Sequence, residues 1–176
     1  MEAKTSKIIS ILEMGTGTRV EIDFIEVLGE NEGVLVGDSA KGFMCVLAET
    51  RETETYPPRP FRVNAGAIHQ YVYVGENQTK YLSEIKAGDR VVVVDGTNER
   101  LVTVGRVKIE SREFERISLD SGITATLQKA DSIFVLGNDG PSHLADIKEG
   151  DVISFFPMQD VARHKGIAIE ETITEK

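Results

Sequence analysis

Apolar and polar residues alternate over much of the chain, a pattern typical of β-strands with one buried face. In the segment Val20–Phe24 the apolar side chains alternate with two acidic ones. We therefore expect the apolar face to pack on a core and the acidic face to lie in water. The alternation shifts by one residue after Phe24, and a second shift lies at Gly105 within Val102–Ile109. Such shifts predict a bulge or bend at both positions.

Tight-turn sequences separate short runs rich in Val, Ile and Thr along the whole chain. Glycine and asparagine mark these turns, as in Gly29–Gly33, Asp95–Asn98 and Gly137–Pro141. Only short helices are expected, at residues 1–12 and at Ser83–Ala87. Many short strands joined by regular turns predict one all-β domain over residues 1–176, built as a barrel or a sandwich.

One stretch of the chain repeats. Leu82–Val91 aligns without gaps to Leu144–Ile153, which lies 62 residues further on, and five positions are identical. The shared pattern predicts a short helical turn that buries Leu and Ile, followed by a Gly-Asp corner that starts the next strand. We infer two similar units, at about residues 79–110 and 141–170, related by a pseudo-twofold axis. The alternative is that such corners are common β-barrel scaffold.

Charge and composition exclude several classes of function. The chain has 176 residues, 29 acidic and 20 basic, and a formal net charge of −9, which argues against binding nucleic acids or anionic membranes. The longest aliphatic run, Val91–Val94, is too short for a membrane span, and no signal peptide is evident. The single Cys45 suits a reducing compartment, so we expect a cytoplasmic protein. The three histidines are scattered without zinc spacing, so no metal site is expected.

A local excess of positive charge marks the first candidate site. No acidic residue occurs from Thr55 through Gly75, which leaves Arg59, Arg62 and His69 as a basic patch on an acidic protein. Guanidinium groups present a planar fork of donors that suits a carboxylate or a phosphate, and Asn64 adds a neutral donor and acceptor. The alternative is that the arginines form ion pairs with acidic residues just upstream, namely Glu49, Glu52 or Glu54.

A second candidate lies on a predicted strand. Arg106, Lys108 and Glu110 share one face, and Val107 and Ile109 take the other. Three charged residues on one strand face form either a solvated exterior or the wall of a cleft beside the bulge at Gly105, and the sequence leaves both open.

A glycine-containing motif in Met14–Arg19 resembles a dinucleotide-binding loop only in part. It lacks the third glycine, and a strand pattern follows it where a helix is required. We therefore do not assign a dinucleotide site to it.

Several segments resemble type II 3-dehydroquinate synthase, a mainly archaeal family. The similarity is strongest in Arg59–His69, which reads Arg-Pro-Phe-Arg-Val-Asn-Ala-Gly-Ala-Ile-His, and in Tyr81–Asp89 and Val104–Glu110. It extends to three further segments, Gly33–Gly37, Ala48–Thr50 and Leu127–Ile133. The resemblance covers nearly all of residues 14–176 and corresponds to the carboxy-terminal half of that family.

The resemblance implies an enzyme that uses NAD to deaminate 2-amino-3,7-dideoxy-D-threo-hept-6-ulosonate oxidatively and cyclises the product to 3-dehydroquinate. It implies that Arg59 and Arg62 hold the substrate carboxylate, and the chemistry of their side chains makes Asn64 and Arg106 further candidates for substrate binding. His69, Lys108 and Glu110 are then candidates for proton transfer.

Because the family's amino-terminal half has no counterpart here, the chain is expected to act either alone or with a separate amino-terminal-half protein. No residue pattern indicates where NAD would bind. The alternatives are a non-catalytic β module that binds a small anionic metabolite or a partner protein, and a homo-oligomeric assembly domain whose β edges pair between copies.

Overall fold

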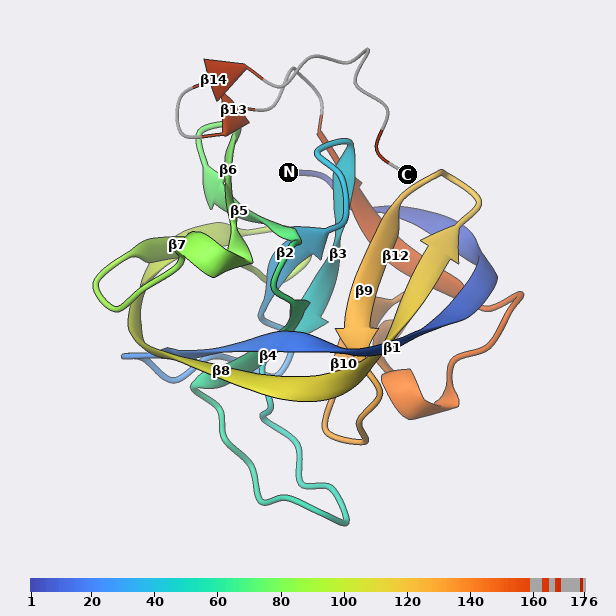
Figure 1. The fold of residues 1–176 in the computed structure, drawn as a ribbon, viewed down its shortest axis with the longest axis horizontal. Helices are drawn as coiled ribbons and strands as arrows, with labels where there is room; N and C mark the ends of the chain where they lie inside the picture. The colour runs from blue at the N-terminus through green and yellow to red at the C-terminus, as the bar shows by residue number, and fades with distance from the viewer. Residues whose placement is uncertain (159–162, 165–166, 169–174, 176) are drawn as a thin grey trace.

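The computed structural model describes residues 1–158, 163–164, 167–168 and 175 of the chain (Figure 1). Over these residues it is all-β, as the alternation predicts, and its helical segments there are two 3-10 turns, η1 at Leu82–Glu84 and η2 at Leu144–Asp146. The strands up to residue 94 are β1 (Lys4–Phe24), β2 (Gly33–Gly37), β3 (Gly42–Leu47), β4 (Arg62–Ala67), β5 (Tyr71–Gly75), β6 (Gln78–Tyr81) and β7 (Arg90–Val94). Those that follow are β8 (Glu99–Leu119), β9 (Thr124–Gln128), β10 (Phe134–Gly137), β11 (Gly140–His143), β12 (Val152–Pro157), β13 (Arg163–His164) and β14 (Ile167–Ala168).

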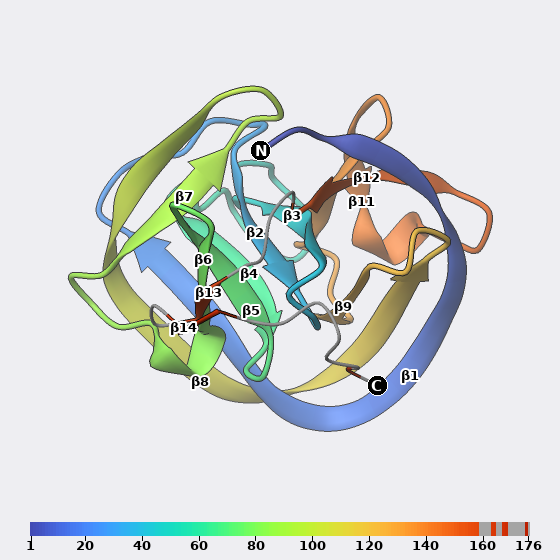
Figure 2. The same cartoon turned by 90° about the horizontal axis from the view of Figure 1, so that it is seen from above.

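Two long strands organise the molecule. β1 and β8 have 21 residues each and pair antiparallel from Ile8–Leu119 to Phe24–Val104. Seen from above, they curve around the other strands (Figure 2). β4 pairs with the second half of β1, and β9 pairs with the second half of β8. The buried Gln70 side chain links β4 to β9, since it donates to Ala65 O at 3.0 Å and accepts from Thr126 N at 2.8 Å.

One bulge accounts for both predicted shifts. Asp23 pairs with Arg106 and Phe24 pairs with Val104, which leaves Gly105 as the extra residue on β8. The prediction that the acidic face of Val20–Phe24 lies in water is wrong. Glu21 and Asp23 are only 4% and 3% exposed, because charged side chains from the neighbouring strands cover them.

The two repeated segments form the same kind of corner. In each, a leucine begins a 3-10 turn and is buried, a glycine with positive φ follows, and an aspartate carboxylate accepts the N–H three residues back. Gly88 then donates to Val104 O on β8, and Gly150 donates to Ile8 O on β1. The wider pseudo-twofold symmetry stays a prediction, and residues 159–162, 165–166 and 169–170 of the second unit lie outside the described part of the chain.

The helix expected at residues 1–12 is absent, because β1 begins at Lys4. Ile8 points into the core that also holds Leu119 and Ile153, so this segment is held by cross-strand packing. Among the described residues, no helix is both long and apolar enough to cross a membrane.

Candidate anion-binding site

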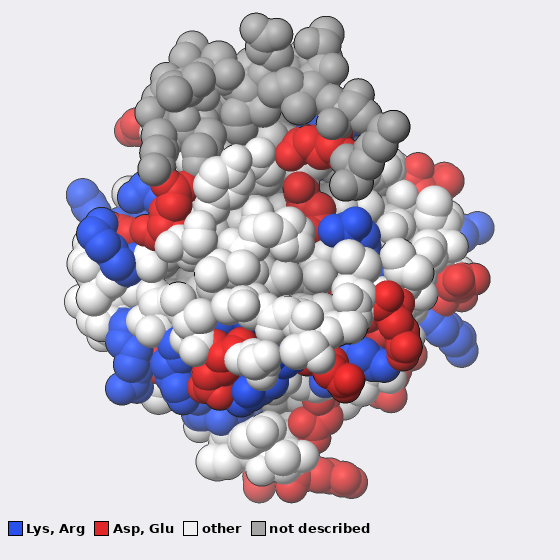
Figure 3. All heavy atoms as spheres, in the orientation of Figure 1, with Lys and Arg blue, Asp and Glu red and all other residues white. Residues whose placement is uncertain are grey.

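The strand register gathers charged residues from β1, β4 and β8 on one face. Alternate positions of β1 face this side, and two of them lie opposite charged or polar residues of both neighbours. Glu21 lies between Asn64 of β4 and Lys108 of β8, and Asp23 lies between Arg62 and Arg106. In the space-filling view basic and acidic side chains form a mixed band over the level of β1 and β8 (Figure 3).

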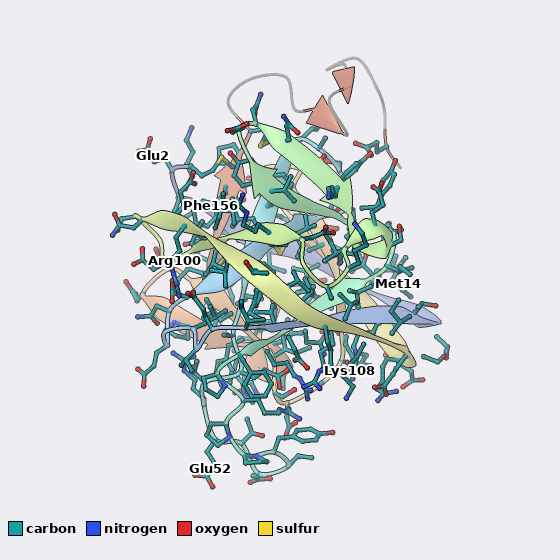
Figure 4. All side chains as sticks on the ribbon, turned by 90° about the vertical axis from the view of Figure 1, so that its left-hand side faces the viewer. Glu2, Met14, Glu52, Arg100, Lys108 and Phe156 are labelled. Atoms are coloured by element: carbon teal, nitrogen blue, oxygen red, sulfur yellow. The ribbon has the colours of Figure 1, made fainter. Side chains whose placement is uncertain are left out.

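Beside these strands lies an open polar hollow of about 200 Å³, here called the anion hollow. Five of its lining residues are basic and two are acidic: Arg19, Arg59, Arg62, Lys108 and Arg112, with Glu21 and Glu110. The remaining lining residues are Tyr56, Asn64, Gln128, Ala130 and Ser132. Figure 4 places Lys108 on the side of β8 from which the loop carrying Glu52 projects.

Asp23 anchors the inner wall of the hollow. It accepts two hydrogen bonds from Arg62, at 2.8 and 3.1 Å, and one from Arg106 at 2.6 Å. Burial alone raises the pKa of Asp23, but the hydrogen bonds from Arg62 and Arg106 outweigh burial and hold that pKa below its usual range. Asp23 therefore stays a carboxylate and fixes one edge of the Arg62 guanidinium.

Arg59 forms the outer wall. One of its terminal nitrogens lies 2.5 Å from the buried Glu49, and its guanidinium stacks on Tyr56 at 4.4 Å from the ring centre. Burial raises the pKa of Glu49 more than Arg59 lowers it. Arg59 and Arg62 thus each have an acidic partner, Glu49 and Asp23, and both also line the hollow.

Several buried polar atoms around the hollow have no hydrogen-bond partner within the described protein. Gln128 Oε1 accepts from Asn64 Nδ2 at 2.7 Å and from Arg19 Nη1 at 2.9 Å, but Asn64 Oδ1, Arg19 Nε and Arg59 Nε remain unpaired. Unpaired buried polar groups are costly, so their clustering favours a polar ligand that engages them.

Lys108 is held more loosely than the arginines. Its ammonium nitrogen lies 3.8 Å from both Glu21 Oε1 and Glu110 Oε1, beyond hydrogen-bond distance, and its side chain is 41% exposed. Glu110 is also paired with Arg112, whose hydrogen bond lowers the pKa of Glu110. The Lys108 ammonium thus lies between the carboxylates of Glu21 and Glu110 and is accessible from solvent.

The structure separates the predicted site residues into two groups. Arg59, Arg62, Asn64, Lys108 and Glu110 all line the anion hollow. Arg106 binds Asp23 on the same face but does not line the hollow, and its side chain is 62% exposed. His69 lies elsewhere, 2.6 Å from Asp38, so its expected place beside the arginines is wrong.

Sequence reasoning missed several lining residues, chiefly Arg19, Glu21, Arg112 and Gln128. The sequence does hold a signal for Arg19 and Glu21, because with Asp23 they place a charge at every second position. Arg106, Lys108 and Glu110 show the same spacing. Two such strands with complementary charges favour each other as neighbours.

Comparison with known proteins identifies the family. A sequence model described as the 3-dehydroquinate synthase II C-terminal domain matches residues 5–176. A 3-dehydroquinate synthase homolog of Aquifex aeolicus is 44% identical over 100% of this chain and 54% of its own length. The 3-dehydroquinate synthase of Methanothrix thermoacetophila is 39% identical over 100% of this chain and 49% of its own length. That of Methanosarcina acetivorans is 41% identical over 99% of this chain and 47% of its own length.

The chain thus spans about half the length of these curated relatives. No solved structure is significantly similar to it. The matched family model and the identities along the whole chain confirm the resemblance seen in Arg59–His69 and Val104–Glu110. This chain belongs to the 3-dehydroquinate synthase II family and corresponds to its C-terminal domain.

Proposed function

We propose that this chain supplies the substrate-anchoring part of a type II 3-dehydroquinate synthase. The observation that carries the proposal is the convergence of Arg59, Arg62, Lys108 and Glu110 on one hollow. The substrate would be 2-amino-3,7-dideoxy-D-threo-hept-6-ulosonate, which carries a carboxylate and an ammonium group. A hollow that is mainly basic but contains Glu21 and Glu110 suits both groups.

The two arginines would hold the substrate carboxylate. A guanidinium has five N–H donors, and Asp23 engages only two of those on Arg62. Arg59 retains an unpaired Nε–H. The neighbouring Asn64 would position a substrate hydroxyl through its unpaired Oδ1. The acidic pair, Glu21 and Glu110, would attract the ammonium group.

Lys108 and Glu110 would transfer the protons. Oxidation of the amine gives an imine, and its hydrolysis adds water and releases ammonia, which requires a proton donor at nitrogen. Ring closure then needs a base that removes a proton next to one carbonyl and an acid that protonates the other. Lys108 would be the acid and Glu110 the base, and Lys108 Nζ lies 3.8 Å from Glu110 Oε1.

NAD would be the oxidant that accepts the hydride, and the anion hollow does not fit it. Its volume of about 200 Å³ lies below the ~300–1,000 Å³ that encloses drug-sized ligands. We therefore propose that NAD binds mainly through the amino-terminal half that the relatives contain, supplied by a partner polypeptide or by the remainder of a longer chain. A cytoplasmic setting goes with this proposal, since the only cysteine, Cys45, is a buried free thiol.

The test is an activity assay with three arms. The purified chain, a purified amino-terminal half from a relative, and their mixture are each given NAD⁺ and the amino acid substrate, and NADH is measured. The proposal expects NADH from the mixture and a large loss with Lys108→Gln. No NADH in any arm, or full activity without this chain, would contradict it.

A second function is favoured by the five basic residues that line the anion hollow, since they suit an anion whether or not a reaction follows. A non-catalytic module that binds a small anionic metabolite would need the arginines but not the proton transfer. Thermal unfolding with a panel of carboxylates and phosphates separates the two: at about a hundred times its Kd a ligand adds roughly 2.7 kcal/mol of stability. Binding without turnover in the mixture would favour this module.

A further inference from the structure

His69 and Asp38 form a second polar cluster outside the anion hollow. His69 lies in the turn between β4 and β5, and Asp38 follows the end of β2. The ring nitrogen Nε2 of His69 lies 2.6 Å from Asp38 Oδ1. The two residues are 31 positions apart, so the fold and not the local sequence brings them together.

Asp38 is held rigidly. Its carboxylate accepts hydrogen bonds from Thr124 Oγ1 and Thr126 Oγ1, both at 2.8 Å, and Arg116 Nε lies 3.1 Å from Oδ2. The side chain is only 9% exposed. Burial alone raises the pKa of Asp38, but the hydrogen bonds from His69 and the two threonines, with the charge of Arg116, outweigh burial and keep it low. Asp38 therefore stays ionised and fixes the imidazole.

This contact determines which nitrogen of His69 is basic. The carboxylate accepts the Nε2–H of the neutral ring, so the lone pair lies on Nδ1. An aspartate that orients a histidine in this way is a recurrent arrangement in general acid–base catalysis. The His69 side chain is 48% exposed, so a small molecule can reach it.

A second hollow lies beside His69. It measures about 250 Å³ and has apolar walls from Met14, Ala67 and Phe114, with the backbone of Gly15–Thr18 along one side. A dry cavity of about 150 Å³ holds benzene, so the space here accommodates one substituted six-membered ring. Among the described residues that line it, His69 is the one basic side chain, which distinguishes this hollow from the anion hollow.

We propose that His69 and Asp38 form an acid–base site for a small ring compound that carries one ionisable hydroxyl, such as a phenol. The ring would lie beside His69 and against Met14 and Ala67, because the Phe114 ring already packs on Gly17. The hydroxyl would give its proton to Nδ1, so that the ligand becomes an oxyanion beside an imidazolium and no other reactant is needed. This proposal does not rest on the function assigned to the anion hollow.

The test uses the full chain and 4-nitrophenol, whose anion is yellow. Titration should show saturable binding with ionisation of the probe, and amide shifts at Gly15–Thr18 and His69 in nuclear magnetic resonance spectra. His69→Gln should weaken binding by more than about tenfold, because it removes a charge-assisted hydrogen bond. His143→Gln is the matched control, since His143 also contacts an aspartate, Asp146 at 3.2 Å, but lies outside this hollow.

Three results would overturn the proposal. The first is no saturable binding of the probe, and the second is binding that His69→Gln leaves unchanged. The third is a nitrogen-15 spectrum in which neutral His69 carries its proton on Nδ1. Neither test requires a substitution of the buried Asp38. The binding test changes only the half-exposed His69, and the nitrogen-15 spectrum is recorded on the unsubstituted chain.

Discussion

Arg62 lies directly opposite Asp23 in the β1–β4 register, and its guanidinium also donates two hydrogen bonds to the Asp23 carboxylate, at 2.8 and 3.1 Å. The backbone pairing therefore places the guanidinium and the carboxylate side by side before any ligand binds. Arg106, opposite the same aspartate on β8, gives it a third hydrogen bond at 2.6 Å. The anion hollow is thus built into the strand register.

Asp23→Ala should destabilise the chain strongly. It removes the carboxylate that accepts two hydrogen bonds from the buried Arg62, although Glu21 Oε1 remains 3.3 Å from Arg62 Nε. Removing one member of a buried ion pair costs about 3–5 kcal/mol. Urea unfolding followed by circular dichroism measures the loss. Asp120→Ala, at an exposed turn position, is the control and should unfold at nearly the same urea concentration as the wild type. Equal effects of the two substitutions would contradict a structural role for the Arg62–Asp23 pair.

Acid should weaken the fold through Asp23 and Asp38. Both have folded-state pKa values below the ordinary value, so the unfolded chain binds protons more readily. Their stabilisation is complete above the unfolded pKa of about 3.9 and is lost as pH falls through the folded pKa. Unfolding free energies measured from pH 7 down to pH 3 should fall most steeply below about pH 4, and less steeply in Asp23→Asn. An unchanged slope in that variant would exclude Asp23 as a cause.

Gly66→Ala should cost much more stability than Gly88→Ala. Both glycines have positive φ, +90° and +91°, so both substitutions carry the same backbone penalty of about 1–2 kcal/mol. At Gly66 an added Cβ would also lie 2.5 Å from Thr126 O on β9, whereas nothing lies within 4 Å at Gly88. Melting temperatures of the two variants measure the difference, and equal melting temperatures would refute the close approach of β4 and β9.

Lys108→Gln should weaken anion binding without unfolding the chain. Lys108 is 41% exposed and lies beyond hydrogen-bond distance of Glu21 and Glu110, so its loss leaves no buried donor unpaired. Titration calorimetry with citrate at low ionic strength should show severalfold weaker binding. Lys129→Gln removes a similarly exposed lysine, which is paired with Glu13 and does not line the hollow, and should bind citrate like the wild type. Loss of binding in both would indicate only a general charge effect.

The sequence predicts the all-β class and the bulge because both follow from side-chain periodicity, which is local. It does not predict which strands pair, and pairing is what turns Glu21 and Asp23 from apparently solvated residues into the buried wall of a site. Alternation shows that a strand has a polar face but not what covers it. The sequence does not predict the position of His69 either, because it does not show that the turn after β4 brings His69 next to Asp38.

The most direct test of the account is a crystal structure of the chain with 2-amino-3,7-dideoxy-D-threo-hept-6-ulosonate bound. We predict that its carboxylate contacts the guanidinium groups of Arg59 and Arg62 and that its amino group lies near Glu21 and Lys108. A substrate carboxylate bound elsewhere, with Arg59 still paired with Glu49 and Arg62 still paired with Asp23 and Glu21, would contradict the central claim.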